Sequence, residues 1–161
     1  MAFAMTASAI PASAEPLAVE AESIRKLDIM LMVTSLRCRM GEHDFQSEYR
    51  RFSAAHLANL NKAGRTMRSQ MHARYGRKGS KRALDRVSVQ MANAYGNGHP
   101  WMNCRELKQV THELSQTSDP ARLSVAAREL LADRPTRGAF MAPREAAVPA
   151  PAQPPILAST R

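Results

Sequence analysis

Apolar side chains recur every three or four residues along most of the chain between residues 23 and 134. This spacing gathers them on one side of an α-helix, whereas a half-buried strand would alternate apolar and polar residues, and no such alternation occurs. The first helix is predicted to begin at Ser23, a residue type that caps helices, and to end at Gly41. It carries two apolar stripes, which predict a helix buried on most sides; their members are Ile24, Leu27 and Leu31, and Ile29, Val33, Leu36 and Met40.

Two further helices are predicted in the middle of the chain. One is capped by Asp44 and extends as far as Tyr75, with Phe45, Phe52, His56 and other apolar-spaced residues on its inner side. A basic turn follows at residues 76–79, and the next helix opens at Ser80 and ends at Tyr95, before two glycines.

The last two predicted helices are shorter. One extends from about Trp101 to Gln116, with Cys104 on its inner side. The other begins after Asp119, with Pro120 at its first position, and stops before Pro135. The pattern therefore predicts an all-α fold, a compact bundle of four to five helices in which the first helix is central.

The two ends of the chain differ in composition from this helical domain at residues 23–134. Six of the ten prolines lie at or after Pro135, mixed with alanine, so residues 135–161 are predicted to be a disordered tail. Residues 1–14 form an apolar start that ends in Ala12-Ser13-Ala14, a small-x-small pattern that signal peptidases accept. We expect cleavage after Ala14 and a periplasmic or secreted protein. A basic stretch before the apolar residues is missing, so the alternative is a flexible start of a cytoplasmic protein.

The cysteines and the hydropathy agree with export. No apolar run approaches the ~20 residues of a membrane span, so no transmembrane segment is expected. Cys38 and Cys104 are too far apart for a redox or zinc CxxC motif. In an exported protein the pair predicts a disulfide that ties the end of the first helix to the start of the fourth. In a cytoplasmic protein the same residues would be two buried thiols.

The positive charge of the chain is concentrated in one segment, and this bears on the expected function. The chain has a formal net charge of +9, and residues 50–86 hold eleven Lys or Arg with Asp85 as their single acid. Such a block favours an anionic partner, whether an acidic protein, a polymer, a lipid surface or nucleic acid. The alternative is a solvated basic face that has no specific partner and aids solubility. The predicted anion-binding patch consists of Arg50, Arg65, Arg68, Arg74, Lys78 and Arg82.

Motifs for catalysis are missing. The sequence has no phosphate-binding loop, dinucleotide fingerprint, nucleophile elbow or metal-binding HExxH, so no cofactor and no metal are expected. The loop at residues 96–101 presents Asn97, His99 and Trp101 as candidates for a ligand. We favour a structural turn in which Trp101 closes the end of the bundle next to Cys104. A weaker alternative is a small hydrolase that uses His99, with Cys104 as its nucleophile unless a disulfide excludes it.

Two stretches carry a resemblance. They are Leu27–Arg39, followed by Asp44-Phe45-Gln46, and Tyr95–Trp101 with Cys104. Over roughly residues 27–114 the chain resembles small exported helical proteins of alphaproteobacteria, mainly of the sphingomonad type. The resemblance implies no activity and no site residues.

Some of these similar proteins carry the label S-adenosyl-L-homocysteine hydrolase. Enzymes of that class are far longer and hold NAD on a Rossmann domain, and this chain has neither the length nor the glycine fingerprint. We therefore treat the label as an error of transfer. The expected function is a binding or structural role in the periplasm, not catalysis. The alternative is a cytosolic nucleic-acid-binding protein, although recognised motifs are missing and aromatic residues are few.

Overall fold

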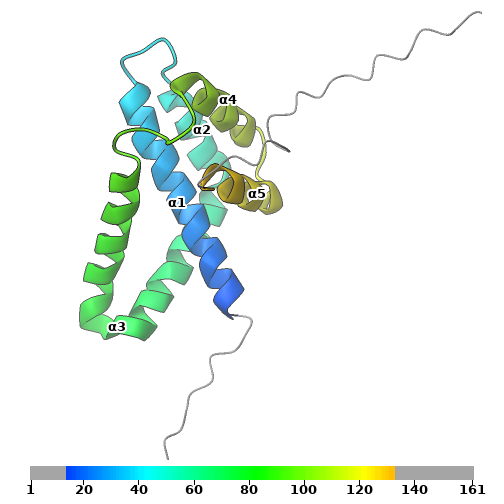
Figure 1. The fold of residues 1–161 in the computed structure, drawn as a ribbon. Helices are drawn as coiled ribbons and strands as arrows, with labels where there is room; N and C mark the ends of the chain where they lie inside the picture. Colours follow the sequence, from blue (N-terminus) through cyan, green and yellow to red (C-terminus); the bar gives the residue numbers. More distant parts are fainter. Residues whose placement is uncertain (1–13, 133–161) are drawn as a thin grey trace, which may run out of the picture.

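A computed structural model of the chain describes residues 14–132 (Figure 1). This part of the chain is all-α, as predicted, and contains five helices: α1 (Ala14–Cys38), α2 (Gln46–Ala55), α3 (Leu57–Ala94), α4 (Cys104–Ser115) and α5 (Pro120–Leu130). The predicted tail lies outside the described residues, and so does all of the predicted signal peptide except Ala14. No helix in the described range is long and apolar enough to cross a membrane.

Helix α1 is the centre of the bundle, as its two apolar stripes predict. It contacts each of the other four helices, and Figure 1 shows it passing between α3 on one side and α5 on the other. Leu27, Met30 and Leu31 are completely buried on it. The predicted start at Ser23 is wrong, because the helix begins at Ala14. The residues between these two positions are mostly good helix formers, and Pro16 lies in the first turn, where its missing N–H breaks no hydrogen bond.

The C-terminal half of α1 also differs from the prediction. Leu36 and Met40, assigned to an apolar stripe, are 49% and 88% exposed, whereas Thr34 and Ser35 are buried. The hydroxyl of Thr34 donates to the carbonyl oxygen of Met30 at 2.7 Å, and that of Ser35 donates to the preceding turn in the same way. These bonds satisfy the polar groups, so this side of the helix can face the core.

The helix predicted over residues 44–75 is interrupted. The predicted cap is displaced by one residue, because Phe45 is the N-cap of α2 and Asp44 precedes it, where its Oδ1 accepts the Gln46 N–H at 2.9 Å. The helix α2 ends at Ala55. His56 leaves the helical conformation at φ −102° and ψ 11°. Its ring is completely buried, 5.1 Å from the ring of Phe52. The break therefore turns a polar ring into the core, where it can reach another helix.

Helix α3 is a hairpin of two arms, residues 57–75 and 77–94, which meet at Gly76 (Figure 1). Gly76 has φ 66° and ψ 179°, a conformation that is essentially restricted to glycine. The predicted turn at residues 76–79 is thus confirmed at its first position. No residue between Met67 and Met91 is buried. The outer part of the hairpin therefore extends from the core into solvent.

Helices α4 and α5 close the bundle, and their starts have strong caps. Asn103 and Glu106 form a reciprocal capping box at the start of α4. The side chain of Asp119 accepts the Ala121 N–H at 2.9 Å, with proline at the first position of α5 as predicted. The predicted disulfide joins Cys38 to Cys104, with their Cα atoms 5.9 Å apart. It fixes the last residue of α1 to the first residue of α4.

Candidate anion-binding site on α3

The structure divides the predicted basic patch between two helices. Arg50 lies on α2, before the break at His56, and the other five residues lie on α3. All six are exposed. The patch extends beyond the predicted set, because α3 carries four more exposed cations: Lys62, Arg77, Lys81 and Arg86. Against nine Lys or Arg, α3 has one acid, Asp85, which leaves a net charge of +8 (9 − 1).

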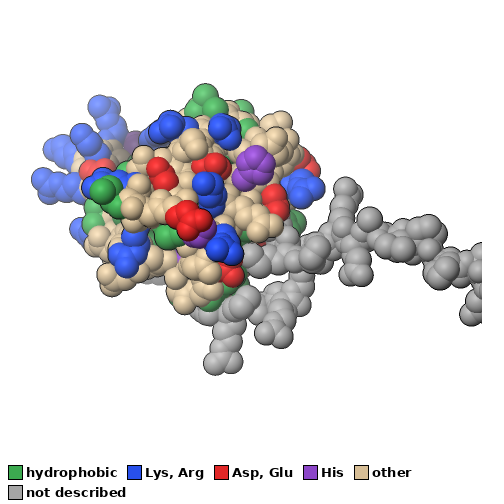
Figure 2. Space-filling model, turned by 90° about the horizontal axis from the view of Figure 1, so that it is seen from above, with side chains coloured by type: hydrophobic (Ala, Val, Ile, Leu, Met, Phe, Trp, Pro, Cys, Tyr) green, Lys and Arg blue, Asp and Glu red, His purple; other side chains and the backbone are tan. Residues whose placement is uncertain are grey.

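These charges are not neutralised within the described part of the protein. Within the described range, residues 14–132, one salt bridge is found, and it joins Arg25 to Asp28 of α1. No salt bridge in this range involves a residue of α3. Figure 2 shows Lys and Arg side chains gathered at the side of the molecule on which the second arm of α3 lies in Figure 1. Near the tip, Arg74 stacks on its neighbour Tyr75, 5.6 Å from the ring centre. The hairpin therefore presents charge that a partner can neutralise.

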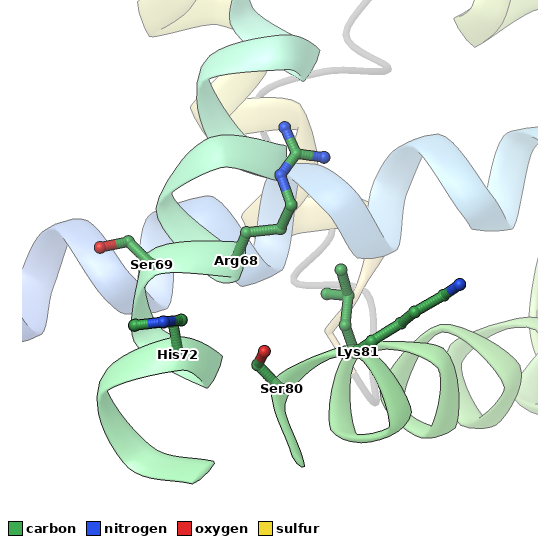
Figure 3. Close-up of a pocket in the computed structure, with 6 residues that line it drawn as sticks. Arg68, Ser69, His72, Ser80 and Lys81 are labelled. Atoms are coloured by element: carbon green, nitrogen blue, oxygen red, sulfur yellow. The ribbon is translucent and has the colours of Figure 1, made fainter. Parts of the chain in front are cut away.

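A cleft of about 400 Å³ lies between the two arms, and we call it the hairpin cleft (Figure 3). Its lining comes from both arms: Arg68, Ser69, His72, Ser80, Lys81 and Leu84. The ring of His72 and the hydroxyl of Ser80 lie on opposite sides of the gap, while Lys81 extends outward. A separate, smaller cavity of about 140 Å³ shares Arg68 and Leu84 with this cleft. Its other lining residues are Arg25, Leu60, Asn61, Gly64, Met67 and Ser88.

The hairpin cleft has the chemistry of an anion site. It is lined by two permanent cations, two hydroxyl groups and an imidazole, and no carboxylate lines it. The Ser80 hydroxyl donates to the Arg77 carbonyl oxygen at 3.3 Å. No hydrogen bond in the described structure joins His72 to a serine or to an acid that would orient it. The arrangement can bind a negative group, but its serines and His72 are not joined by the hydrogen bonds that connect the members of a catalytic triad.

The loop before α4 uses its candidate residues to hold the fold together. Nε2 of His99 lies 2.8 Å from the carbonyl oxygen of Leu130, the last residue of α5. Nδ1 accepts the backbone N–H groups of Trp101 and Met102, at 3.4 and 3.2 Å. Because Nδ1 is an acceptor, the proton must be on Nε2, and the ring is neutral. Burial lowers the pKa of His99, which favours this neutral form.

The remaining loop residues support the structural interpretation. Trp101 packs against the core and donates from Nε1 to the Ala132 carbonyl oxygen at 3.1 Å. It lies edge-on to His99, with ring centres 4.7 Å apart. Asn97 is exposed. Since both nitrogens of His99 are engaged and Cys104 is in a disulfide, the weaker hydrolase alternative has neither a free base nor a free nucleophile in this loop.

Two buried polar groups were missed by sequence reasoning. Asp28 is 6% exposed and accepts hydrogen bonds from Arg25 at 2.7 Å and from the Tyr49 hydroxyl at 3.0 Å. Burial raises the pKa of Asp28, although both partners act in the opposite direction. The sequence predicts that His56 lies in the core but does not indicate a hydrogen-bond partner for it. In the structure its Nε2 lies 3.0 Å from the Leu114 carbonyl oxygen. The partners of Asp28 and His56 across the bundle are distant in sequence, and no local pattern signals such pairs.

Metal binding and similarity to known proteins add nothing to this site. Between residues 14 and 132, no three His, Cys, Asp or Glu side chains converge in a way that could hold a metal ion. No protein-family model, no curated protein and no solved structure matches the chain. The resemblance to alphaproteobacterial exported proteins therefore stays a prediction, and the functional argument depends on the chain's own geometry.

Proposed function

We propose that this is a non-enzymatic binding protein that acts outside the cytoplasm and uses the α3 hairpin to hold an anionic partner. The observation that carries the proposal is the nine-to-one excess of cations over acids on α3, without a salt bridge in the described structure. Like charges on one element repel each other, and an anionic partner relieves this repulsion. A face that served solubility alone would gain more from charges of both signs.

The disulfide supports a location outside the cytoplasm. Cytoplasmic thiols are kept reduced, so a bond between Cys38 and Cys104 persists best in an oxidising compartment. Cleavage after Ala14 would remove one residue of α1 and leave the rest of that helix intact. Mass spectrometry of the protein from its native cell should find an N-terminus at Glu15. An intact Met1 in the cytoplasmic fraction would contradict the location.

An anionic lipid surface or polymer fits the hairpin better than nucleic acid does. Proteins that bind single strands stack bases on aromatic side chains, and Tyr75 is the single aromatic residue of α3. Duplex binding through phosphates alone would be unspecific and steeply salt-dependent. Cytosolic nucleic-acid binding remains the second candidate because the same basic hairpin suits phosphate contacts.

Binding measured over a series of salt concentrations distinguishes three possibilities: an anionic lipid surface or polymer as the partner, nucleic acid as the partner, and a basic face that only aids solubility. The full chain is titrated with phosphatidylglycerol vesicles, with neutral phosphatidylcholine vesicles and with duplex DNA. We expect binding to the anionic vesicles that weakens as salt rises, and weak, unspecific binding to DNA. Tight, sequence-selective DNA binding at ~150 mM salt, where the screening length is ~8 Å, would overturn the proposal. A failure to bind any polyanion at low salt would leave the charge as a solubility feature.

Matched charge variants locate the surface. The double variant Arg74→Gln/Arg82→Gln removes two charges from α3, and Arg122→Gln/Arg128→Gln removes two exposed charges from α5. We expect the first variant to weaken vesicle binding and the second to leave it nearly unchanged. Equal effects would show that net charge, and not the hairpin, governs binding.

A further inference from the structure

We propose that the hairpin cleft is a discrete binding site for a phosphate ester, a phosphoryl group joined to a small apolar group. This inference rests on the proposed anion-binding function of α3 and adds a place and a ligand class to it. It makes a stronger claim than surface attraction, because it assigns binding to side chains of the cleft, in particular Arg68 and Lys81.

The donors of the hairpin cleft favour a phosphoryl group. A phosphate monoester carries a charge of about −1.5 to −2 at neutral pH and three oxygen acceptors, which match the two cations of the cleft. Arg68 offers a planar fork of N–H donors, and Lys81 offers a mobile point charge on a flexible stem. The His72 ring and the Ser69 hydroxyl are further polar groups of the first arm, while the Ser80 hydroxyl of the second arm would have to turn from the Arg77 carbonyl oxygen to donate to a ligand. A group with several oxygens can use donors on both sides of the gap, whereas a halide cannot.

The size and the walls of the cleft favour an ester over free phosphate. A volume of about 400 Å³ lies within the ~300–1,000 Å³ of small-molecule sites. Such a space is several times larger than a phosphate ion. The inner cavity of about 140 Å³ is lined in part by the polar residues Arg25, Asn61 and Ser88. Its apolar wall consists of Leu60, Met67 and Leu84, and Leu84 also lines the hairpin cleft. The phosphoryl group would lie among the donors, and the organic group would extend inward along these apolar side chains.

No carboxylate of the described structure pairs with the cations of the cleft, and this also favours the binding of an anionic ligand. No carboxylate lines either cavity, and Asp85, the acid of α3, is not among the lining residues. Arg68 and Lys81 have no ion-pair partner in the described structure. A ligand therefore would not have to displace an internal salt bridge before it binds. In Figure 3 Arg68 extends upward from the first arm and Lys81 extends away from the gap, and their rotatable stems allow both to turn toward a ligand.

Calorimetric titration of the full chain tests the site, with inorganic phosphate, hexyl phosphate, hexyl sulfate and hexanol as probes. We expect hexyl phosphate to bind more tightly than inorganic phosphate, and hexanol to bind weakly. Equal affinities for hexyl phosphate and inorganic phosphate would overturn the assignment of an ester. Tighter binding of the sulfate ester, which carries one charge, would overturn the assignment of phosphate.

Charge-matched variants distinguish a built site from diffuse attraction. Arg68→Gln and Lys81→Gln each remove one cation from the cleft lining, and Arg77→Gln removes one exposed cation of the same hairpin that does not line it. We expect each cleft variant to weaken hexyl phosphate binding about tenfold, the loss of one charge-assisted hydrogen bond, and Arg77→Gln to weaken it less than twofold. Equal losses in the three variants would overturn the site and leave the proposed function standing. A wild-type chain that binds no anion would overturn both.

A steric variant tests the inner cavity without a change of charge. Gly64 lines that cavity, and a Cβ added there meets no atom within 4 Å. Gly64→Leu should weaken hexyl phosphate binding and leave phosphate binding unchanged, while equal binding of both would contradict the placement of the organic group. Phosphatidylglycerol vesicles then identify the source of the ester. If Lys81→Gln weakens vesicle binding as much as hexyl phosphate binding, the site takes a lipid headgroup; if vesicle binding persists, it takes a soluble ester.

Discussion

The ring of His99 donates from Nε2 to the carbonyl oxygen of Leu130, 2.8 Å away, at the last residue of α5. Its other nitrogen accepts two backbone N–H groups of its own loop. His99 thus satisfies a carbonyl group that a helix end leaves without a helical partner, and it shapes the loop that leads into α4. His56 also bonds the end of α4, through the carbonyl oxygen of Leu114 at 3.0 Å, which accepts the Thr117 N–H at 3.4 Å as well. Two histidines therefore fasten the ends of two helices.

Removal of the His99 ring should destabilise the protein. His99→Ala leaves the Leu130 carbonyl group and two loop N–H groups without their partner, and we expect a loss of about 1–3 kcal/mol in the free energy of unfolding. His99→Gln keeps a donor amide near the position of Nε2 and should lose less. Urea unfolding measures both variants. If the alanine variant is as stable as the wild type, the ring does not fasten α5.

Stability should also fall on mild acidification. Burial lowers the pKa of His56 and of His99 below the ordinary value of 6.5. In the window below 6.5 the unfolded chain therefore binds more protons than the folded chain, and the free energy of unfolding decreases as the pH falls. Asp28 acts in the opposite direction, because its raised pKa makes the folded state bind a proton more readily, but its window lies nearer 3.8.

The measurement is urea unfolding at pH 7.5 and pH 5.5. The wild type should lose stability between the two, and His99→Gln should lose less because it removes one of the titrating groups. His112→Gln is the control, since His112 is exposed. An unchanged or higher stability at pH 5.5 would show that the buried rings do not resist protonation.

The sequence predicts the fold best where the determinants are local. Asp119 followed by proline marks the start of α5, and Gly76 marks the turn of the hairpin, because each depends on its own backbone conformation. The break at His56 was missed because the apolar spacing continues through it. Its partner Leu114 is 58 positions away, and no local pattern could reveal that contact.

The candidate site also has features that the sequence predicts and features that depend on tertiary packing. The basic residues of α3 could be predicted from composition alone, since exposed charge needs no partner. The hairpin cleft could not, because it depends on the angle at Gly76 and on which side chains of the second arm face Arg68 and His72. The contacts of His99 support the structural interpretation of its loop, but the partner of its Nε2, the Leu130 carbonyl oxygen, lies on α5 and is 31 positions away in the sequence.

The disulfide should behave as one unit in a double-mutant comparison. Cys38→Ser and Cys104→Ser each remove the same bond, and each should cost about 2–5 kcal/mol, the usual range for small secreted domains. The double variant should cost no more than either single variant, apart from small packing effects. Peptide mapping without reductant should join the two cysteine peptides in the wild type. Additive losses, or two free thiols in the exported protein, would contradict the bond.

Two glycines of α3 should respond to alanine in opposite directions. Gly76 has φ 66° and ψ 179°, which an L-residue adopts at a cost of about 1–3 kcal/mol, so Gly76→Ala should destabilise the protein. Gly64 lies within the first arm, and a Cβ there meets nothing within 4 Å. Gly64→Ala should therefore stabilise the protein by about 0.5–1 kcal/mol, the gain that alanine has over glycine inside a helix.

The Gly76→Ala variant also tests whether the hairpin cleft depends on the turn between the two arms. If Gly76→Ala relieves its strain by changing the angle between the arms, the distance between Arg68 and Lys81 changes with no change in net charge. Hexyl phosphate binding should then weaken at constant ionic strength, although the net charge of the protein is unchanged. Thermal unfolding and calorimetry on the two alanine variants check both parts. A Gly76→Ala protein as stable as the wild type, with unchanged hexyl phosphate affinity, would show that neither the arm angle nor the cleft depends on this glycine.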